Sequence, residues 1–243
     1  MRVFILGGTS GIGLALAQHY LQRGDTVAIA GRDLARLPES PLRAHAALQM
    51  FQLDIGDQPG VNQALDQFAA DGLDLLIVTA GLYFNTRSHS LDEATTLHML
   101  RTNVSGLSHA FECAARSMLP RRSGHLVAVA SIAGLLQDYP GASLYSATKR
   151  SVLSLCETYR MALTPFSIAV TAIVPGYVDT AKLRALNNGD ARHKPFLLSE
   201  AQAVERIVDA IEKRKAMAIF PWQMHWLVAV LNRLPRALLK LRR

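Results

Sequence analysis

Short apolar runs recur along the chain, separated by longer stretches in which apolar residues repeat every three or four positions. Most runs are continuous rather than alternating, which is typical of parallel strands covered by helices on both faces. We expect strands near 2–7, 26–30, 47–52, 74–79, 124–130, 167–174 and 216–220. We expect helices near 12–23, 59–70, 92–118, 144–163 and 200–214. This alternation predicts an α/β fold with a doubly wound, seven-stranded parallel sheet.

Two of the predicted helices carry long apolar stripes. The first runs through Leu97, Leu100, Val104, Leu107, Phe111, Ala114 and Met118, and we interpret it as core or interface. The second runs through Tyr145, Lys149, Val152, Cys156, Tyr159 and Leu163. Because it begins with a polar pair and continues as an apolar stripe, its start is expected at a site and its end in packing.

Length and composition fit one domain. Half of the 243 residues are apolar, and no linker or repeat interrupts them, so we expect a domain over 1–220 followed by a basic, leucine-rich tail over 221–243. The first apolar run is too short for a signal-peptide core, and no run approaches about twenty apolar residues. Two cysteines indicate no disulfide framework and fit a reducing compartment, so a cytoplasmic location is expected.

A glycine-rich turn follows the first predicted strand directly and opens a helix. Gly7, Gly11 and Gly13 are spaced G-x-x-x-G-x-G, with Thr9, Ser10 and Ile12 between them. Such a turn lets the backbone approach a pyrophosphate, and the following helix offers free N–H groups to it. The sequence therefore predicts a dinucleotide site.

The ends of the next two strands suggest which dinucleotide binds. Asp54, followed by Ile55, could accept a hydrogen bond from an adenine amino group, or simply cap a turn. Where an acid would bind the ribose 2′-hydroxyl, the second strand ends in Gly31 and Arg32. Arginine suits a 2′-phosphate, which favours NADP(H) over NAD(H), unless Arg32 is an ordinary surface cation.

Tyr145 and Lys149 lie four residues apart and share one helix face. An ammonium beside a phenol favours the phenolate and lowers the phenol pKa from about 10, which makes tyrosine a useful acid or base. Ser131 stands 14 residues before Tyr145, at the end of a predicted strand.

Together these motifs resemble the short-chain dehydrogenases/reductases in their compact, single-domain, Rossmann-type form. The resemblance covers about residues 2–220. Besides the residues above, it rests on Ala80-Gly81, Asn103-Val104-Ser105-Gly106 and Pro175-Gly176-Tyr177-Val178-Asp179-Thr180.

The resemblance implies NAD(P)(H)-dependent oxidation of an alcohol or reduction of a carbonyl. It implies that Tyr145 is the proton donor, that Lys149 lowers its pKa and binds the nicotinamide ribose, and that Ser131 orients the substrate oxygen. Asn103 would anchor a water in a proton relay. The carboxamide would be held by Thr180 and the Val178 backbone, after Pro175 and Gly176, while Ala80 and Gly81 would pass beside the cofactor.

The chain departs from the family pattern at one place. Two asparagines usually precede the Ala-Gly pair, whereas this chain has Val78 and Thr79. A hydroxyl lacks the two-sided bonding of an amide, which puts some sheet-stabilising hydrogen bonds in doubt.

The substrate is less well defined. Predicted loops at the carboxyl ends of the strands suit an apolar or aromatic carbonyl compound, with Tyr83, Phe84, Leu135, Leu136, Tyr139, Tyr177, Leu183 and Leu186 as candidate walls. Segment 181–198 is interpreted as a mobile lid. We assign no metal site.

The tail supports two interpretations. The net charge of +7 is uneven, because no acid follows Glu212 while eight basic residues do. Trp222, Trp226 and a leucine-rich stretch suggest a surface that lies on acidic lipid as a peripheral membrane contact. The alternative, which we favour at this stage, is packing against the same or a neighbouring subunit. Nucleic acid is not expected, since no basic–aromatic groove is evident.

The main hypothesis is therefore an NADP(H)-dependent oxidoreductase. Its alternative is a non-catalytic dinucleotide-binding regulatory protein, against which the set Asn103, Ser131, Tyr145 and Lys149 argues. A sugar-nucleotide epimerase would need a further substrate domain after residue 200. The helices at 92–118 and 144–163 resemble those that pair in family dimers, so we expect a homodimer or homotetramer.

Overall fold

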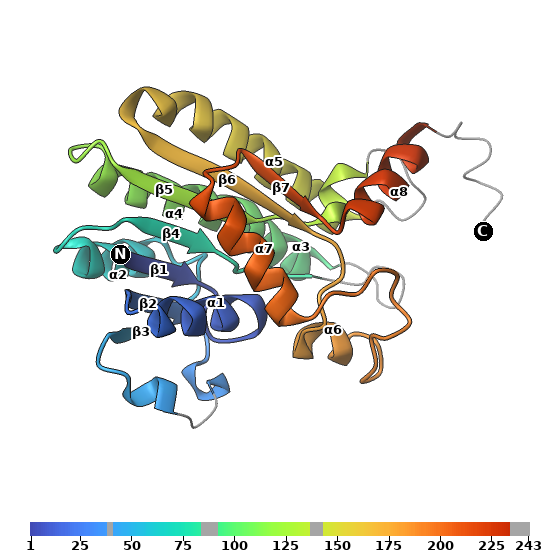
Figure 1. The fold of residues 1–243 in the computed structure, drawn as a ribbon, viewed down its shortest axis with the longest axis horizontal. Coiled ribbons are helices and arrows are strands. Elements are labelled where there is room, and N and C mark those ends of the chain that lie inside the picture. The colour runs from blue at the N-terminus through green and yellow to red at the C-terminus, as the bar shows by residue number, and fades with distance from the viewer. Residues whose placement is uncertain (38–40, 84–91, 137–142, 234–243) are drawn as a thin grey trace.

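Seven parallel strands form one sheet at the centre of the molecule. The computed structural model describes residues 1–37, 41–83, 92–136 and 143–233. The sheet has the order β3-β2-β1-β4-β5-β6-β7 (Figure 1). Its strands are β1 (Arg2–Leu6), β2 (Thr26–Gly31), β3 (Leu48–Gln52), β4 (Leu75–Val78), β5 (Gly124–Val129), β6 (Ile168–Pro175) and β7 (Met217–Phe220). The predicted doubly wound, seven-stranded sheet is confirmed.

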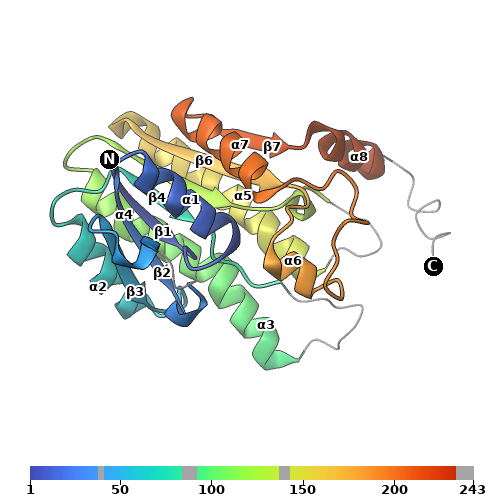
Figure 2. The same ribbon diagram turned by 60° about the horizontal axis from the view of Figure 1, so that its bottom comes forward.

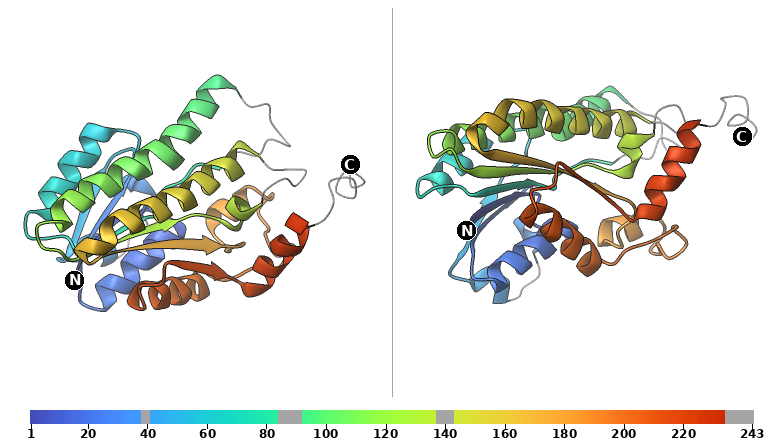
Figure 3. Two further views of the ribbon diagram at one scale, coloured as in Figure 1. Left: turned by 90° about the horizontal axis from the view of Figure 1, so that it is seen from above. Right: turned by 45° about the horizontal axis from the view of Figure 1, so that its top comes forward.

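Helices cover both faces of the sheet (Figure 3). On one face lie α2 (Gln58–Ala69), α4 (Gly106–Met118) and α5 (Leu144–Leu163), and on the other α1 (Gly11–Gln22) and α7 (Glu200–Glu212). Successive residues of a strand point to opposite faces. Phe4 and Leu6 of β1 accordingly join the core under α2, α4 and α5, while Val3 and Ile5 join the other core. Continuous apolar strands are thus explained by two cores.

The predicted helix over 92–118 is divided by a wider turn. It consists of α3 (Glu93–Leu100), a π-helical turn at Arg101–Ser105, and α4. A π-helical turn inserts extra backbone, so the residues before it rotate relative to those after it. Phe111 in α4 is therefore buried, whereas Leu97 and Leu100 in α3 are exposed. Figure 2 shows α3 extending away from the sheet.

The second predicted stripe behaves as expected along α5. Lys149, Val152, Cys156 and Leu163 are buried, with Lys149 near the start of the helix and Leu163 at its end. The two cysteines of the chain, Cys113 and Cys156, are buried and not joined by a disulfide.

Two further helices lie near the carboxyl ends of the strands (Figure 1). They are α6 (Ala181–Ala185) and α8 (Trp222–Arg233). Met224 and Val228 of α8 pack into the core shared with α4 and α5. None of the helices within the described ranges has the length and apolar character needed to cross a membrane.

The strand order indicates a ligand site beyond the carboxyl ends of the central strands. The chain winds outward from β1 to β3, then returns to the other side of β1 as β4. At this reversal, ligands of open α/β sheets bind beyond the carboxyl ends of the strands. The glycine turn after β1, the loop after β4 and the loop after β5 all end there.

A buried histidine connects β5 and β6 to the turn before β7 at the opposite end of the sheet. His125 in β5 lies 2.8 Å from the Thr171 hydroxyl of β6, which donates to the Lys215 carbonyl at 2.6 Å. Because that hydroxyl has only one proton, His125 Nε2 is the donor of the first bond. Burial, aided by the Arg214 charge, lowers the pKa of His125 to about 4.

This pKa predicts a loss of stability in mild acid. Between about pH 6.5 and 4 the unfolded chain binds a proton at His125 that the folded chain excludes, so the free energy of unfolding falls by up to about 3 kcal/mol. His125→Gln removes this titration, and its urea-unfolding free energy is expected to vary less over that range. The exposed His225, changed to Gln, serves as the control and should leave the wild-type pH dependence intact. An equally steep decline in His125→Gln would contradict the assignment.

Candidate active site

The glycine turn after β1 packs directly against the end of β4. Gly7 has φ +93°, and a side-chain carbon there would lie 2.5 Å from the Ala80 nitrogen. A side-chain carbon at Gly13 would overlap the Gly7 carbonyl and lie 2.5 Å from Thr79 Oγ1. These two glycines are therefore required for the close approach of α1 to the turn and to β4.

Thr79 takes a direct part in holding this turn. Its hydroxyl lies 3.1 Å from the Leu6 carbonyl and 3.0 Å from the Gly7 carbonyl, as a donor shared between them. The backbone N–H of Ala80 also donates to Leu6, at 2.9 Å. The hydrogen bonds put in doubt by the missing asparagine are thus partly replaced by a threonine hydroxyl.

The amino-terminal end of α1 faces the start of α6. Ser10 precedes α1, and among the described residues its side chain does not cap the helix, whose first turn contains no acid. A side-chain carbon at Gly11 would meet no backbone atom at close range: its nearest neighbours are the Thr180 side chain at 3.4 Å and Glu200 Oε1 at 3.9 Å. The N–H groups at this helix end, including that of Ile12, therefore suit an anion. Thr9 is buried against Gly31.

Arg32 follows β2 and lies between two other elements. Its Nε is 3.9 Å from the Asp54 carboxylate, and its Nη1 donates to His98 Nε2 of α3 at 3.2 Å. Asp54 also accepts from the Gly56 N–H at 2.8 Å, which is the turn-capping role considered as its alternative. Ile55 is buried, and its carbonyl lies against Gly106. The predicted adenosine residues are thus adjacent to one another.

Lys149 is buried at the centre of the site. Only 5% of its surface is exposed, and its Nζ donates to the Val129 carbonyl at 2.9 Å. A side-chain carbon at Gly81 would lie 3.2 Å from this Nζ, so glycine leaves room for the ammonium. Burial, and to a lesser extent the Lys182 charge, lowers the pKa of Lys149 to about 8.

Tyr145 lies one turn before Lys149 on α5. Its ring centre is 5.9 Å from Lys149 Nζ and 4.9 Å from the Tyr83 ring, which it meets edge to face. Burial raises the pKa of Tyr145 to about 12, while a hydrogen bond with Ser131 acts in the opposite direction. The shift is therefore opposite to the one predicted from the Tyr145–Lys149 spacing, because loss of solvent around the phenol outweighs its polar neighbours.

Ser131 is positioned by a short turn that packs on α5. It precedes η4, a single helical turn at Ile132–Leu135, and accepts from the Ala133 N–H at 3.2 Å. A side-chain carbon at Gly134 would lie 2.8 Å from the Lys149 carbonyl carbon. The contact between η4 and the α5 backbone thus holds Ser131 beside Tyr145.

Asn103 lies in the π-helical turn and is 1% exposed. Its Oδ1 accepts from the Leu82 N–H at 2.7 Å, and its Nδ2 donates to the Leu82 carbonyl at 2.9 Å and to Thr148 Oγ1 at 3.0 Å. Thr148 in turn donates to the Tyr145 carbonyl at 2.8 Å. The predicted water relay stays a prediction, whereas these bonds join the loop after β4 to the helix that carries Tyr145.

The loop after β6 closes the other side of the site. Pro175 ends β6, and the Gly176 N–H donates to the Phe220 carbonyl at 2.7 Å. Val178 is buried and pairs with Leu198. Thr180 caps α6 by accepting from the Leu183 N–H at 3.1 Å.

Sequence reasoning missed some contributors to this region. Lys182, in the predicted lid, donates to the Gly81 carbonyl at 2.8 Å and so joins α6 to the loop after β4. His98 and Thr148 were also missed, because neither belongs to a recognisable motif. Only the i+3 spacing of Thr148 from Tyr145 could have indicated a role in positioning that tyrosine. Phe84 and Tyr139, two candidate substrate walls, lie outside the described residues.

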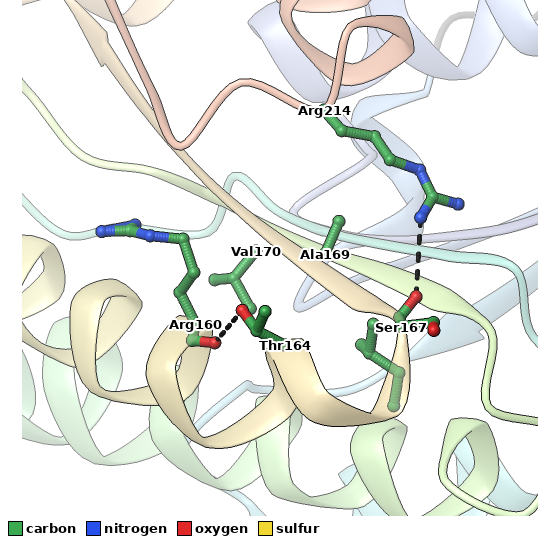
Figure 4. A pocket seen from close by; sticks show the side chains of 7 residues that line it. Arg160, Thr164, Ser167, Ala169, Val170 and Arg214 are labelled. Carbon is green, nitrogen blue, oxygen red and sulfur yellow. Dashed lines mark hydrogen bonds between the residues drawn. The ribbon is translucent and has the colours of Figure 1, made fainter.

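A separate hollow of about 230 Å³ lies at the other end of β6 (Figure 4). Arg160, Thr164, Ser167 and Arg214 line it, and Arg214 donates to the Ser167 carbonyl at 3.5 Å. None of the predicted catalytic or cofactor residues lines this hollow. The hollow is therefore separate from the candidate active site, which lies at the carboxyl ends of the strands.

Comparison with known proteins identifies the family of the chain. Residues 1–191 match the family model described as short chain dehydrogenase. The chain belongs to the short-chain dehydrogenase family. An oxidoreductase of Myxococcus xanthus strain DK1622 is 32% identical over 225 residues, which cover 90% of this chain and 87% of that protein.

Solved structures of other short-chain dehydrogenases have the same fold. One from Streptomyces avermitilis has a TM-score of 0.81 at 22% identity, covering 98% of this chain and 95% of that one. The closed form of a serine dehydrogenase complexed with NADP⁺ has a TM-score of 0.78 at 26% identity, covering 87% and 89%. This short-chain dehydrogenase is accordingly an oxidoreductase.

The Thr79 contacts predict a measurable contribution to stability. Thr79→Val keeps the side-chain shape but removes the donor to the Leu6 and Gly7 carbonyls, so the free energy of unfolding should fall by about 1 kcal/mol. Urea denaturation measures the change, and Thr79→Ser, which retains the hydroxyl, is the matched control. Equal stability of the wild type and Thr79→Val would show that these bonds contribute nothing.

Proposed function

We propose that this short-chain dehydrogenase interconverts a ketone or aldehyde and an alcohol, with NADP(H) preferred over NAD(H) and an apolar substrate. The observation that carries the proposal is the cluster at the carboxyl ends of the strands in which half-buried Ser131 and Tyr145 lie beside buried Lys149. Ser131 is a hydrogen-bond donor to oxygen, Tyr145 an acid and Lys149 a cation. Together they suit proton transfer at a carbonyl or alcohol oxygen.

The acid–base roles follow from the protonation states. With its pKa raised to about 12, Tyr145 keeps its proton at neutral pH and is available as the donor to a carbonyl oxygen. Lys149, with a pKa of about 8, remains mostly charged at pH 7 and can favour the phenolate that Tyr145 becomes after donation. Ser131 then orients the substrate oxygen and stabilises the negative charge that develops on it.

The residues present fit a nicotinamide dinucleotide. The turn over 7–13 leaves Gly11 uncrowded beside a helix end without a side-chain cap, which suits a pyrophosphate. Asp54 and Ile55 would hold the adenine, Ala80 and Gly81 would lie beside the ribose, and Lys149 would hold the nicotinamide ribose. The nicotinamide end of the cofactor would be held by the loop after β6, through Pro175, Gly176, Val178 and Thr180. When bound, the cofactor supplies or accepts the hydride.

Arg32 supports the preference for a 2′-phosphate. It stands at the end of β2, where an acid would repel that phosphate, and its exposed guanidinium carries several donors. His98 orients the guanidinium from α3. The NADP⁺ bound by the similar serine dehydrogenase is consistent with this assignment.

The described walls favour an apolar substrate. Tyr83 lies against Tyr145, while Leu135, Leu136 and Tyr177 are partly buried around the same end of the sheet. A compact apolar or aromatic carbonyl compound would bury these surfaces while presenting one oxygen to Ser131 and Tyr145.

Tyr145→Phe tests the acid–base role. The substitution removes the donated proton but not the ring contact with Tyr83, so turnover should fall by roughly 10²- to 10⁴-fold with cofactor affinity nearly unchanged. Turnover of carbonyl substrates and NADPH fluorescence titration measure the two effects. Tyr83→Phe is the matched control, since it removes a neighbouring phenol without removing the proposed acid. Wild-type turnover in Tyr145→Phe would refute the role.

Arg32→Ala tests the cofactor preference. Loss of a charged donor to the 2′-phosphate should weaken NADPH binding by roughly tenfold to a hundredfold, with little change for NADH. Fluorescence titration with each dinucleotide measures the ratio. Arg192→Ala removes an exposed cation of the 181–198 segment and controls for the general loss of charge. An equal effect on NADPH and NADH would remove the 2′-phosphate assignment.

A further inference from the structure

One face of α8 is apolar and exposed. Trp222, Trp226 and Val230 follow one another at intervals of four residues, so they form a single stripe. Their exposed fractions are 64%, 62% and 49%, and the adjacent Leu227 is 42% exposed. Met224 and Val228, on the opposite face, are buried. The helix is thus fixed to the protein through one face and has, within the described residues, no cover on the other.

The area and composition of this stripe suit a lipid interface better than a stable protein interface. Its four side chains expose on the order of 400 Å² together, roughly half of what each partner of a standard protein complex buries. Tryptophan is the residue that best tolerates the boundary between water and hydrocarbon, because its ring is apolar and its N–H is polar.

The charged residues in and beyond α8 are all basic. Arg233 is exposed three residues after Val230, on the same side of the helix. No acid occurs after Glu212, and the sequence beyond α8 combines leucines with Arg236, Lys240, Arg242 and Arg243. A basic, leucine- and tryptophan-containing segment is complementary to anionic lipid headgroups.

The position of α8 relates this stripe to the substrate end of the site. Asn232 Nδ2 donates to the Leu135 carbonyl of η4 at 2.8 Å. Met224 packs against Gly176, since a side-chain carbon at Gly176 would lie 3.2 Å from Met224 Cγ. The helix therefore braces η4, which follows Ser131, and the start of the loop after β6. Figure 1 shows α8 at the carboxyl end of β7.

We propose that the exposed face of α8 docks on an anionic lipid surface, with Arg233 contacting the headgroups. Docking in this orientation brings the carboxyl edge of the sheet close to the lipid, from which an apolar carbonyl compound would reach the site. The docking does not rest on the proposed activity; only the delivery of substrate does.

The two tryptophans provide a direct test. They are the only tryptophans in the chain, and both lie on this stripe, so tryptophan emission, excited selectively over tyrosine, reports on it alone. Phosphatidylcholine vesicles that contain phosphatidylserine should shift the emission to shorter wavelength and sediment with the protein. Pure phosphatidylcholine vesicles should do neither, and high salt should reverse the binding.

Variants separate the apolar and the charged contributions. Trp222→Gln combined with Trp226→Gln should weaken co-sedimentation at least about tenfold, and Arg233→Gln by roughly fivefold. Met161→Gln on α5 is the control, because Met161 is as exposed as Trp222, at 64%, and lies away from α8. NADPH titration of each variant verifies that the fold is retained and tests the proposed function separately from docking.

Three outcomes would overturn the proposal. The first is no emission shift and no sedimentation with anionic vesicles. The second is emission already at short wavelength without vesicles: if it depends on protein concentration, a second copy covers the stripe, and if it does not, the chain's own end does. The third is unchanged vesicle binding in the double tryptophan variant.

Discussion

The buried ammonium of Lys149 is the constraint around which the site is arranged. A charge removed from water is costly unless it is hydrogen-bonded, and here the Val129 carbonyl at the end of β5 provides the acceptor. The position also requires Gly81, which leaves space beside the ammonium, and Gly134, which lets η4 pack on the α5 backbone at the same residue. Satisfying the lysine therefore fixes the loops after β4 and β5 relative to the helix that carries Tyr145.

Local patterns were enough to predict the scaffold and to choose candidate site residues that the fold brings together at one end of the sheet. The strands are buried on both faces, so their apolar runs are continuous, and the glycines at 7 and 13 mark contacts that no side chain could occupy. The Tyr145–Lys149 spacing correctly predicted that both belong to one helix face. It could not predict the pKa of Tyr145, because the raised value comes from burial by segments far away in the sequence.

The features that escaped prediction all depend on separate elements meeting in space. The π-helical turn at Arg101–Ser105 has no clear sequence signature, yet it places Asn103 against both Leu82 and Thr148. The contact between Arg32 and His98 joins residues 66 positions apart. Thr79 shows that residue identity alone can also suggest a loss that does not occur. The motif lacks its usual asparagine, yet the Thr79 hydroxyl donates to two carbonyl oxygens because it lies within reach of both.

The turn η4 is held on one side by α5 and on the other by α8, and these two supports differ in how far the family shares them. Gly134 fixes η4 on α5, within the 1–191 range that matches the family, whereas Asn232 holds the adjacent Leu135 carbonyl from α8, outside that range. The start of the loop is thus anchored to the framework matched by the family model, while the following residues are supported by a segment outside that range. Changes in α8 would then reshape the loop around Leu135 without moving Ser131, so the two ends of this loop can vary separately.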